Sequence, residues 1–269
     1  MKNSVVLNER ILFLKKLKRK KRFILTAQIG LLVLLILLWE IMADLGVIDS
    51  FITSQPSRVV NTIINLSKGD LLLHLGVTCT ETIIGFVSGV FLGLILASVL
   101  WWFQTFSEIF EPYLVILNSL PKIALGPIII IWVGAGMNAI IVMALAISLV
   151  VTVMELLNGF NNTDANMIKM AKTFGATKAQ IYSKIVFPAN ITTLVNSLKI
   201  NLGLSLVGVI AGEFLVSKAG LGYLIVYGGQ VFKLDLVMAS VIILAVFAAI
   251  IYKIVLIFEK IILKNRRSL

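Results

Sequence analysis

The sequence is poor in the residues that cross-link, ligate metals or carry charge in ordinary globular proteins. It has one cysteine and one histidine in 269 residues, and only 14% of its residues are charged. A single cysteine excludes a disulfide scaffold, and together with a single histidine it excludes a zinc site built from several such ligands. The pattern GxxxxGK[ST] is also missing, so the chain does not bind the phosphates of ATP with that loop.

Apolar residues are abundant instead. They make up 59% of the chain, and the mean hydropathy is +1.03. An average globular domain is about 45–50% apolar and about 25% charged, so a soluble, disordered or fibrous protein is excluded. The net charge of +11 would suit a nucleic acid. The charges, however, cluster at the ends of apolar segments, which favours a lipid surface. We expect no nucleic-acid partner, no metal and no cofactor.

Six segments are long and apolar enough to cross a bilayer, which takes about 20 residues. The sequence therefore predicts an all-α membrane protein, a polytopic bundle of about six transmembrane helices. The first segment is too long for a signal peptide, and no small-residue cleavage site follows it. We expect a basic N-terminal tail over 1–23, a transmembrane domain over 24–257 and a C-terminal tail over 258–269. The six segments are 24–46, 78–102, 113–134, 138–158, 191–215 and 235–257.

Lysine and arginine are distributed unevenly between the loops. With six spans, the two tails and the 159–190 loop share one side of the membrane and hold seventeen of these residues. The other side holds four: Arg58, Lys68, Lys218 and Lys233. Because positively charged loops stay in the cytoplasm, both termini are predicted to be cytoplasmic.

Small residues recur every fourth position in two of the predicted spans. Such spacing lets two helix backbones approach closely, which is how helices gain contact in lipid. Each row of small residues packs either against another helix of the same chain or against a second copy of the chain, and we favour packing within one chain. The second span carries Gly85, Gly89, Gly93 and Ala97, and the fifth carries Gly208 and Gly212.

The third span carries two prolines, Pro121 and Pro127. Proline removes a backbone donor and clashes with the previous turn, so the helix must kink or break there. Kinked helices at membrane depth often border a cavity, because their freed carbonyls need polar partners. Ser119 and Pro121 are therefore candidates for the border of a translocation path, although plain helix distortion explains the prolines nearly as well.

Polar groups within the spans give further candidates. Asn201 and Ser205 belong to a polar stripe that faces either a solute path or a neighbouring helix, and the two alternatives are equally good. Glu213 joins them as a path candidate. The carboxylates lie near span ends, which argues against a proton-coupled transporter. His74 has no ligand or catalytic partner near it in the sequence, so we expect no task for it.

The 159–190 loop is much longer than its neighbours, and long ordered loops are usually functional. From Met167 it reads MIKMAKTFGATKAQIYSKIVFPAN. Apolar residues at helical spacing precede Gly175, which suits a left-handed helix C-terminus. Thr177 and Gln180 then form a capping box that starts a second short helix, and Pro188 marks its end or a bend. We expect this helix pair to dock into another protein, the alternative being that it folds back on the bundle.

The loop resembles the EAA loop of ABC importer permeases, the membrane subunits of binding-protein-dependent uptake systems. The family pattern is EAA-x3-G-x9-I-x-LP, and the sequence matches it at Ala171, Gly175, Ile185 and Pro188. It departs where Lys169 stands for Glu, Met170 for Ala and Phe187 for Leu. The resemblance implies that two short helices sit in a groove of an ATPase subunit. It assigns the coupling role to Lys169, Ala171, Gly175, Ala176, Thr177, Ile185 and Pro188.

The resemblance covers roughly residues 55–260. The segments LPKIALGPIIIIWVGAG from Leu120 and NLGLSLVGVIAGEFLVSKAGLGYLI from Asn201 are similar to the nitrate, sulfonate and taurine branch. Thr78 and Gly85 match a T-x2-R-x3-G pattern in which Glu81 takes the place of Arg.

The resemblance implies the type I ABC importer permease fold and a multi-pass location in a bacterial cytoplasmic membrane. Its implied partners are two ATPase copies, a second permease copy in a homodimer and an extracytoplasmic solute-binding protein. The permease itself would be non-catalytic. The implied substrate is a small anion, such as a sulfonate, taurine or nitrate, or a related compound. The alternatives are an ion-gradient-driven secondary transporter or channel, and a membrane scaffold or membrane-embedded enzyme.

Overall fold

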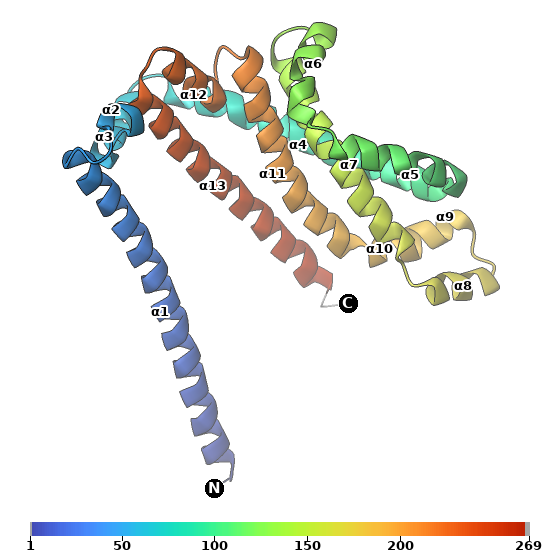
Figure 1. Cartoon of the computed structure of the whole chain (residues 1–269). Helices are drawn as coiled ribbons and strands as arrows, with labels where there is room; N and C mark the ends of the chain where they lie inside the picture. Colours follow the sequence, from blue (N-terminus) through green and yellow to red (C-terminus); the bar gives the residue numbers. More distant parts are fainter. Residues whose placement is uncertain (1, 267–269) are drawn as a thin grey trace. The chain divides into compact units, whose positions relative to one another are not determined.

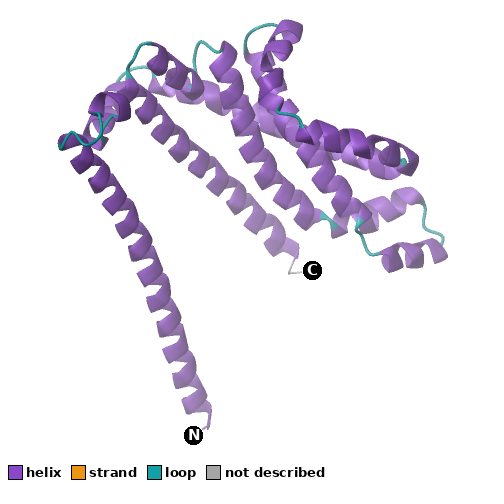
Figure 2. Ribbon diagram, in the orientation of Figure 1, coloured by secondary structure: helices purple, strands orange, loops and turns teal. Residues whose placement is uncertain are grey.

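The computed structural model describes residues 2–266, and within that range helices are joined by short loops without any strand (Figures 1 and 2). The chain divides after Ile64 into two compact units, each of which is treated by itself below.

The first unit is dominated by one long helix, α1 (Lys2–Asp44). The basic segment and the first apolar span form one continuous helix. Residues 15–38 are all exposed, so the apolar side chains among them suit lipid. A short helix, α2 (Ser50–Thr53), follows, and α3 (Pro56–Ser67) begins next to α1, where the Ser57 backbone N–H donates to Glu40 Oε2 at 3.0 Å.

The second unit contains the remaining spans and the loop between the fourth and fifth of them. Its longest helices are α4 (Leu71–Trp102), α7 (Met137–Asn161), α11 (Ile191–Val216) and α13 (Leu234–Arg266). The shorter ones are α5 (Gln104–Ser119), η1 (Lys122–Leu125), α6 (Gly126–Val133), α8 (Ala165–Thr173), α9 (Lys178–Ile181), the π turn η2 (Tyr182–Val186), α10 (Phe187–Ala189) and α12 (Leu221–Gln230).

Among the described residues, five helices are long and apolar enough to cross a membrane, and a bent pair makes a sixth crossing if it is counted as one. This agrees with the prediction of about six spans. The third span breaks at its prolines, one of the two outcomes, a kink or a break, that the sequence predicted. α5 and the segment Lys122–Val133 meet at 90°. The second span also starts earlier than expected, at Leu71 instead of residue 78.

Proline chemistry explains the break in the third span. Leu120, directly before Pro121, has φ −67° and ψ 141°, the extended conformation that a following proline favours. The chain then makes one 3₁₀ turn and restarts as α6, with Pro127 in its first turn, where a missing N–H costs nothing. Two prolines six residues apart therefore end one helix and begin another.

Helix α7 packs against both α4 and α11 at very close range. A Cβ atom added to Gly85 of α4 would lie 2.8 Å from Ala144 Cβ, and one added to Gly93 would lie 2.5 Å from Thr152 Cγ2. On α11, a Cβ atom at Gly208 would lie 2.5 Å from the Cα of the same Ala144. Both small-residue stripes therefore lie against α7 of the same chain, the arrangement favoured from the sequence.

We expect Gly208→Ala to destabilise the bundle, because the added methyl group meets backbone atoms of Ala144 that cannot rotate away. Overpacking of this kind costs about 1–3 kcal/mol. Gly203→Ala is the matched control on the same helix, since nothing lies within 4 Å of its Cβ position. Thermal unfolding of the two purified variants should show a lower midpoint for Gly208→Ala alone. Equal midpoints would contradict the close contact.

Candidate functional site

The loop from 159 to 190 is tied together at its base. Asn190 Nδ2 donates to Thr163 Oγ1 at 2.8 Å and to the Val186 carbonyl oxygen at 2.9 Å. Thr163 follows the end of α7, and Asn190 directly precedes α11. Both side chains are buried, so this amide holds the two ends of the loop at a fixed separation.

The two short helices of the loop meet at Gly175, as the sequence predicted. Gly175 has φ +75°, a left-handed conformation that costs residues with a Cβ atom about 1–2 kcal/mol. The Ala176 N–H donates to the Ala171 carbonyl and the Gly175 N–H to the Lys172 carbonyl, both at 3.0 Å, which is the Schellman pattern of helix ends. The capping box is also confirmed: Thr177 and Gln180 exchange side-chain-to-backbone hydrogen bonds.

One face of the helix pair packs back onto the bundle. Ile181 and Val186 are buried with Leu156 and Phe160 of α7, and the half-buried Ala171 and Ala176 pack against the same cluster. The alternative considered from the sequence, in which the loop folds onto the bundle, is thus correct for this inner face.

Polar and aromatic contacts join the loop to the end of α4. Lys178 Nζ donates to the Trp102 carbonyl oxygen at 2.5 Å and lies 5.7 Å and 5.8 Å from the ring centroids of Trp101 and Trp102. Tyr182 contacts Ser98 Oγ through its hydroxyl at 2.5 Å, and its ring lies 5.2 Å from that of Trp101. Charge-assisted and cation–π contacts each add about 0.5–3 kcal/mol, so the loop and the end of α4 form one stiff unit.

The outer face of the helix pair carries large apolar side chains. Phe174 is 84% exposed, Met170 54% and Met167 46%, and all three lie on or directly after α8. Lys169 is exposed beside them. We call Met167, Met170 and Phe174 the apolar tip. Clustered exposed apolar side chains mark an interaction surface, because burial against a partner removes them from water.

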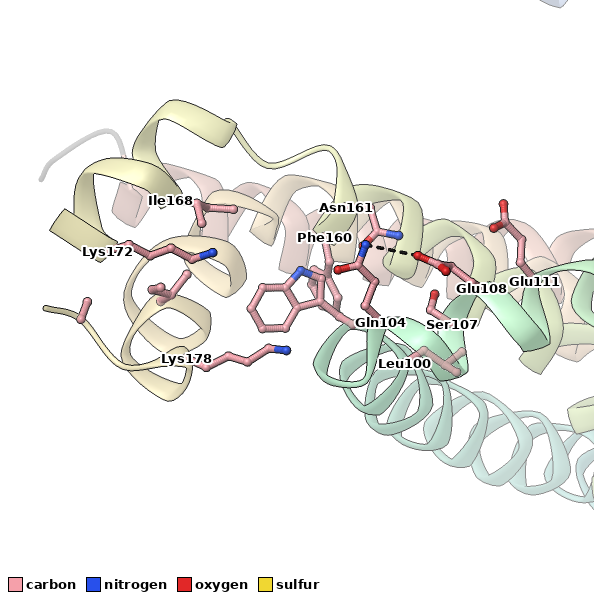
Figure 3. Close-up of a pocket in the computed structure, with 13 residues that line it drawn as sticks. Leu100, Gln104, Ser107, Glu108, Glu111, Phe160, Asn161, Ile168, Lys172 and Lys178 are labelled. Atoms are coloured by element: carbon pink, nitrogen blue, oxygen red, sulfur yellow. Dashed lines mark hydrogen bonds between the residues drawn. The ribbon is translucent and has the colours of Figure 1, made fainter.

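A cavity of about 620 Å³ lies between the loop and α5 (Figure 3). Lys172 and Lys178 line it from the loop, and Glu108 and Glu111 line it from α5. Gln104 Nε2 donates to Glu108 Oε1 at 3.3 Å along the α5 wall. The loop is therefore supported by α4 and α7, with charges of opposite sign facing it across the cavity from α5.

The candidates for a translocation path fall into two groups. Asn201 and Ser205 are fully buried, and Asn201 Nδ2 donates to Thr152 Oγ1 of α7 at 2.6 Å, while Ser205 Oγ donates to Asn201 Oδ1 at 3.1 Å. These two side chains join helices, the alternative left open from the sequence. Ser119 and Pro121 are exposed at the bend between α5 and α6 and stay candidates.

Glu213 is also buried rather than set on an open surface, and it holds the start of α12. Its Oε1 accepts from Thr78 Oγ1 at 2.6 Å, and its Oε2 accepts from the Gly222 N–H at 2.5 Å. The first N–H groups of a helix have no partner within the helix, and a carboxylate there is favoured by the helix dipole. Gly220 is required beside it, because a Cβ atom at this position would clash with the Glu213 carboxyl group.

His74 has a task, contrary to expectation. Its Nδ1 accepts from the Gly220 N–H at 3.0 Å, and Thr78 Oγ1 accepts from the Leu221 N–H at 2.8 Å. Together with Glu213, these side chains of α4 and α11 satisfy consecutive N–H groups at the start of α12. The G-L-G run at 220–222 is the sequence feature that lies at this helix start. It gives no indication of the distant side chains that bind there.

Comparison with known proteins places this arrangement in a family. The family described as "Binding-protein-dependent transport system inner membrane component" matches residues 89–268. A probable ABC transporter permease of Haemophilus influenzae is 29% identical, over 81% of this chain and 89% of its own length. A putative aliphatic sulfonates permease of Bacillus subtilis, SsuC, is 28% identical over 87% and 85%. The taurine permease TauC of Escherichia coli is 24% identical over 91% and 92%.

Among solved structures, an inward-facing MetNI methionine ABC transporter is similar, with 21% identity, a TM-score of 0.49 and coverage of 68% of this chain and 92% of that chain.

The chain belongs to this family of binding-protein-dependent importers. It is a multi-pass inner-membrane permease of an ABC transporter, and its described residues form the all-α helical bundle expected from the sequence. Members of the family work with an ATPase and with a solute-binding protein. Family membership also decides against the secondary transporter, channel and scaffold alternatives.

We expect Gly175→Val to distort the turn between α8 and α9, whereas Gly175→Asn should largely preserve it. Nothing lies within 4 Å of the Cβ position of residue 175. A difference in stability between the two variants therefore reports backbone conformation and not a steric clash. Asparagine tolerates positive φ, and a β-branched residue does not. Limited proteolysis of the purified permease should cut Gly175→Val faster within the loop. Equal protection of both variants would contradict a strained turn at this position.

Proposed function

We propose that the chain translocates a small solute delivered by an extracytoplasmic binding protein, driven by ATP hydrolysis on two separate ATPase subunits. A second copy of the chain completes the path, and the subunit itself carries out no covalent chemistry. The substrate is a sulfonate-, taurine- or nitrate-like anion or a related compound. The names of the sulfonate and taurine relatives support this substrate class.

The apolar tip is the single observation that carries the proposal. It consists of three large exposed side chains on a helix pair whose turn, cap and inner face are all fixed. A preformed apolar surface binds with little loss of conformational entropy. We infer that the tip inserts into a groove of the ATPase, with Ala171, Gly175, Ala176, Thr177, Ile185 and Pro188 shaping the helix pair and Lys169 at its rim.

Force from the ATPase reaches the bundle through the contacts at the base of the loop. Lys178 ties the helix pair to the end of α4, and Asn190 ties the end of α7 to the start of α11. When the ATPases close on ATP, the loop moves with them and carries the attached helix ends. Such rigid-body motion converts inward-open into outward-open helices. Both termini and the loop lie in the cytoplasm in this arrangement.

We expect Phe174→Ser to weaken binding of the ATPase at least about tenfold, because buried aromatic anchors commonly contribute 2 kcal/mol or more to an interface. ATP-dependent uptake in reconstituted vesicles should fall in parallel. Phe232→Ser is the matched control for ATPase binding, since Phe232 is 71% exposed in the turn between α12 and α13. The measurement is co-purification of the ATPase with each variant in detergent. If the Phe174→Ser variant co-purifies with as much ATPase as the unmodified permease, the apolar tip is not part of the interface.

A further inference from the structure

The break between α5 and α6 lies beside the middle of α7. On the side of the loop, a cavity of about 500 Å³ is lined by α5 up to Asn118 and by α7 from Val151 onward. On the other side, a Cβ atom added to Gly126 would lie 3.4 Å from Met143 Cε of α7. Met143 is about 9 Å from the start of α7, and Val151 is about 15 Å from its end. The turn η1, which contacts α7 between these levels, is therefore far from both ends of the bundle.

A charged side chain stands at this break. Lys122 begins η1, and its Nζ donates to Asn118 Oδ1 at 3.1 Å. An ammonium group has three N–H donors, and this amide oxygen is its single acceptor among the described residues. No described carboxylate forms an ion pair with it, in contrast to Lys199 of α11, whose Nζ lies 3.0 Å from Glu259 Oε1. The described part of the chain therefore leaves the charge of Lys122 unbalanced at depth.

The surroundings of Lys122 are open rather than packed. Its own side chain is half-buried, and residues 119–121, 123 and 124 are exposed. Pro121 has no N–H, so the carbonyl oxygen of Leu117 lacks its usual helical donor. An unbalanced charge and a broken backbone are both costly against hydrocarbon, and at membrane depth they occur where protein or water covers them. The open side of the break therefore suits a water-filled path and not lipid.

Lys122 also sets the sign of the charge at the break. The charged side chains that line the cavity beside it are both acidic, Glu111 of α5 and Glu155 of α7. A path bordered by these carboxylates alone would repel an anion. The ammonium group of Lys122, held by Asn118 at the end of the same cavity, supplies the attraction that an anionic solute needs there.

We propose that Lys122 faces the solute path in the middle of the membrane and contacts the acidic group of the solute in transit. The inference rests on the proposed function and adds to it a residue that determines specificity. Asn118 positions the ammonium group, and the flexible lysine stem with its rotatable donors lets the contact form and break as the solute passes.

Thiol labelling beside Lys122 tests the proposal without knowledge of the natural solute. Ser119→Cys in a Cys79→Ser background, assembled with the ATPase in membrane vesicles, offers one thiol at the break. The probes are two membrane-impermeant methanethiosulfonates, one with an ethylsulfonate group and one with an ethyltrimethylammonium group. Lys122→Gln should lower the rate of the sulfonate reagent relative to the cationic one at least about tenfold, because a nearby unit charge changes both rates in opposite directions. Lys122→Arg keeps the charge and should keep the ratio.

Val33→Cys is the control for a side chain that faces lipid, since it lies amid the exposed apolar residues of α1 and should react with neither reagent. If Ser119→Cys reacts as slowly as Val33→Cys, the break faces lipid and the proposal is overturned. A ratio of rates that is the same with lysine and glutamine at position 122 would overturn it as well. The labelling needs neither ATP hydrolysis nor a binding protein. Normal labelling in a permease that lacks ATP-driven uptake would thus count against the proposed function alone.

Discussion

The close approach of α7 to α4 and α11 is the contact on which the rest of the molecule depends. In lipid there is no hydrophobic drive to bring helices together, so association relies on tight packing and hydrogen bonds between helices. Here glycines at 85, 93 and 208 let side chains and backbone of α7 approach to contact distance, and Asn201 bonds to Thr152 across the same seam. The loop emerges at one end of this seam, and the contact between Glu213 and the start of α12 lies at the other.

This arrangement connects the two ends of the helical bundle through few joints. A 25-residue helix such as α7 is about 38 Å long, so a stiff seam carries a displacement across most of a bilayer. At the loop end, Asn190 and Lys178 prevent the helix pair from moving independently. At the other end, Glu213 connects the last turn of α11 to α12. In the proposed mechanism, motion imposed on the apolar tip reaches the start of α12 through few flexible joints.

Local chemistry in the sequence predicted the features that depend on neighbouring residues. Apolar run lengths predicted the spans, and Gly175 with the Thr177–Gln180 box predicted the helix pair. Features that depend on contacts between residues far apart in the sequence could not be predicted. Thr78 meets Glu213 across 135 positions, and His74 meets Gly220 across 146. Two prolines predicted a kink or a break in the third span, but not the 90° angle between the two resulting segments. The buried polar stripe of α11 was equally consistent with a path until the position of α7 was known.

Hydrogen–deuterium exchange on the permease with and without its ATPase subunit tests most directly whether the helix pair is the docking element for the ATPase. We expect slower exchange of backbone amides over 167–178 when the ATPase is added, while the α12 amides at the far end stay unchanged. Exchange in the helix pair that is the same with and without bound ATPase would contradict that role.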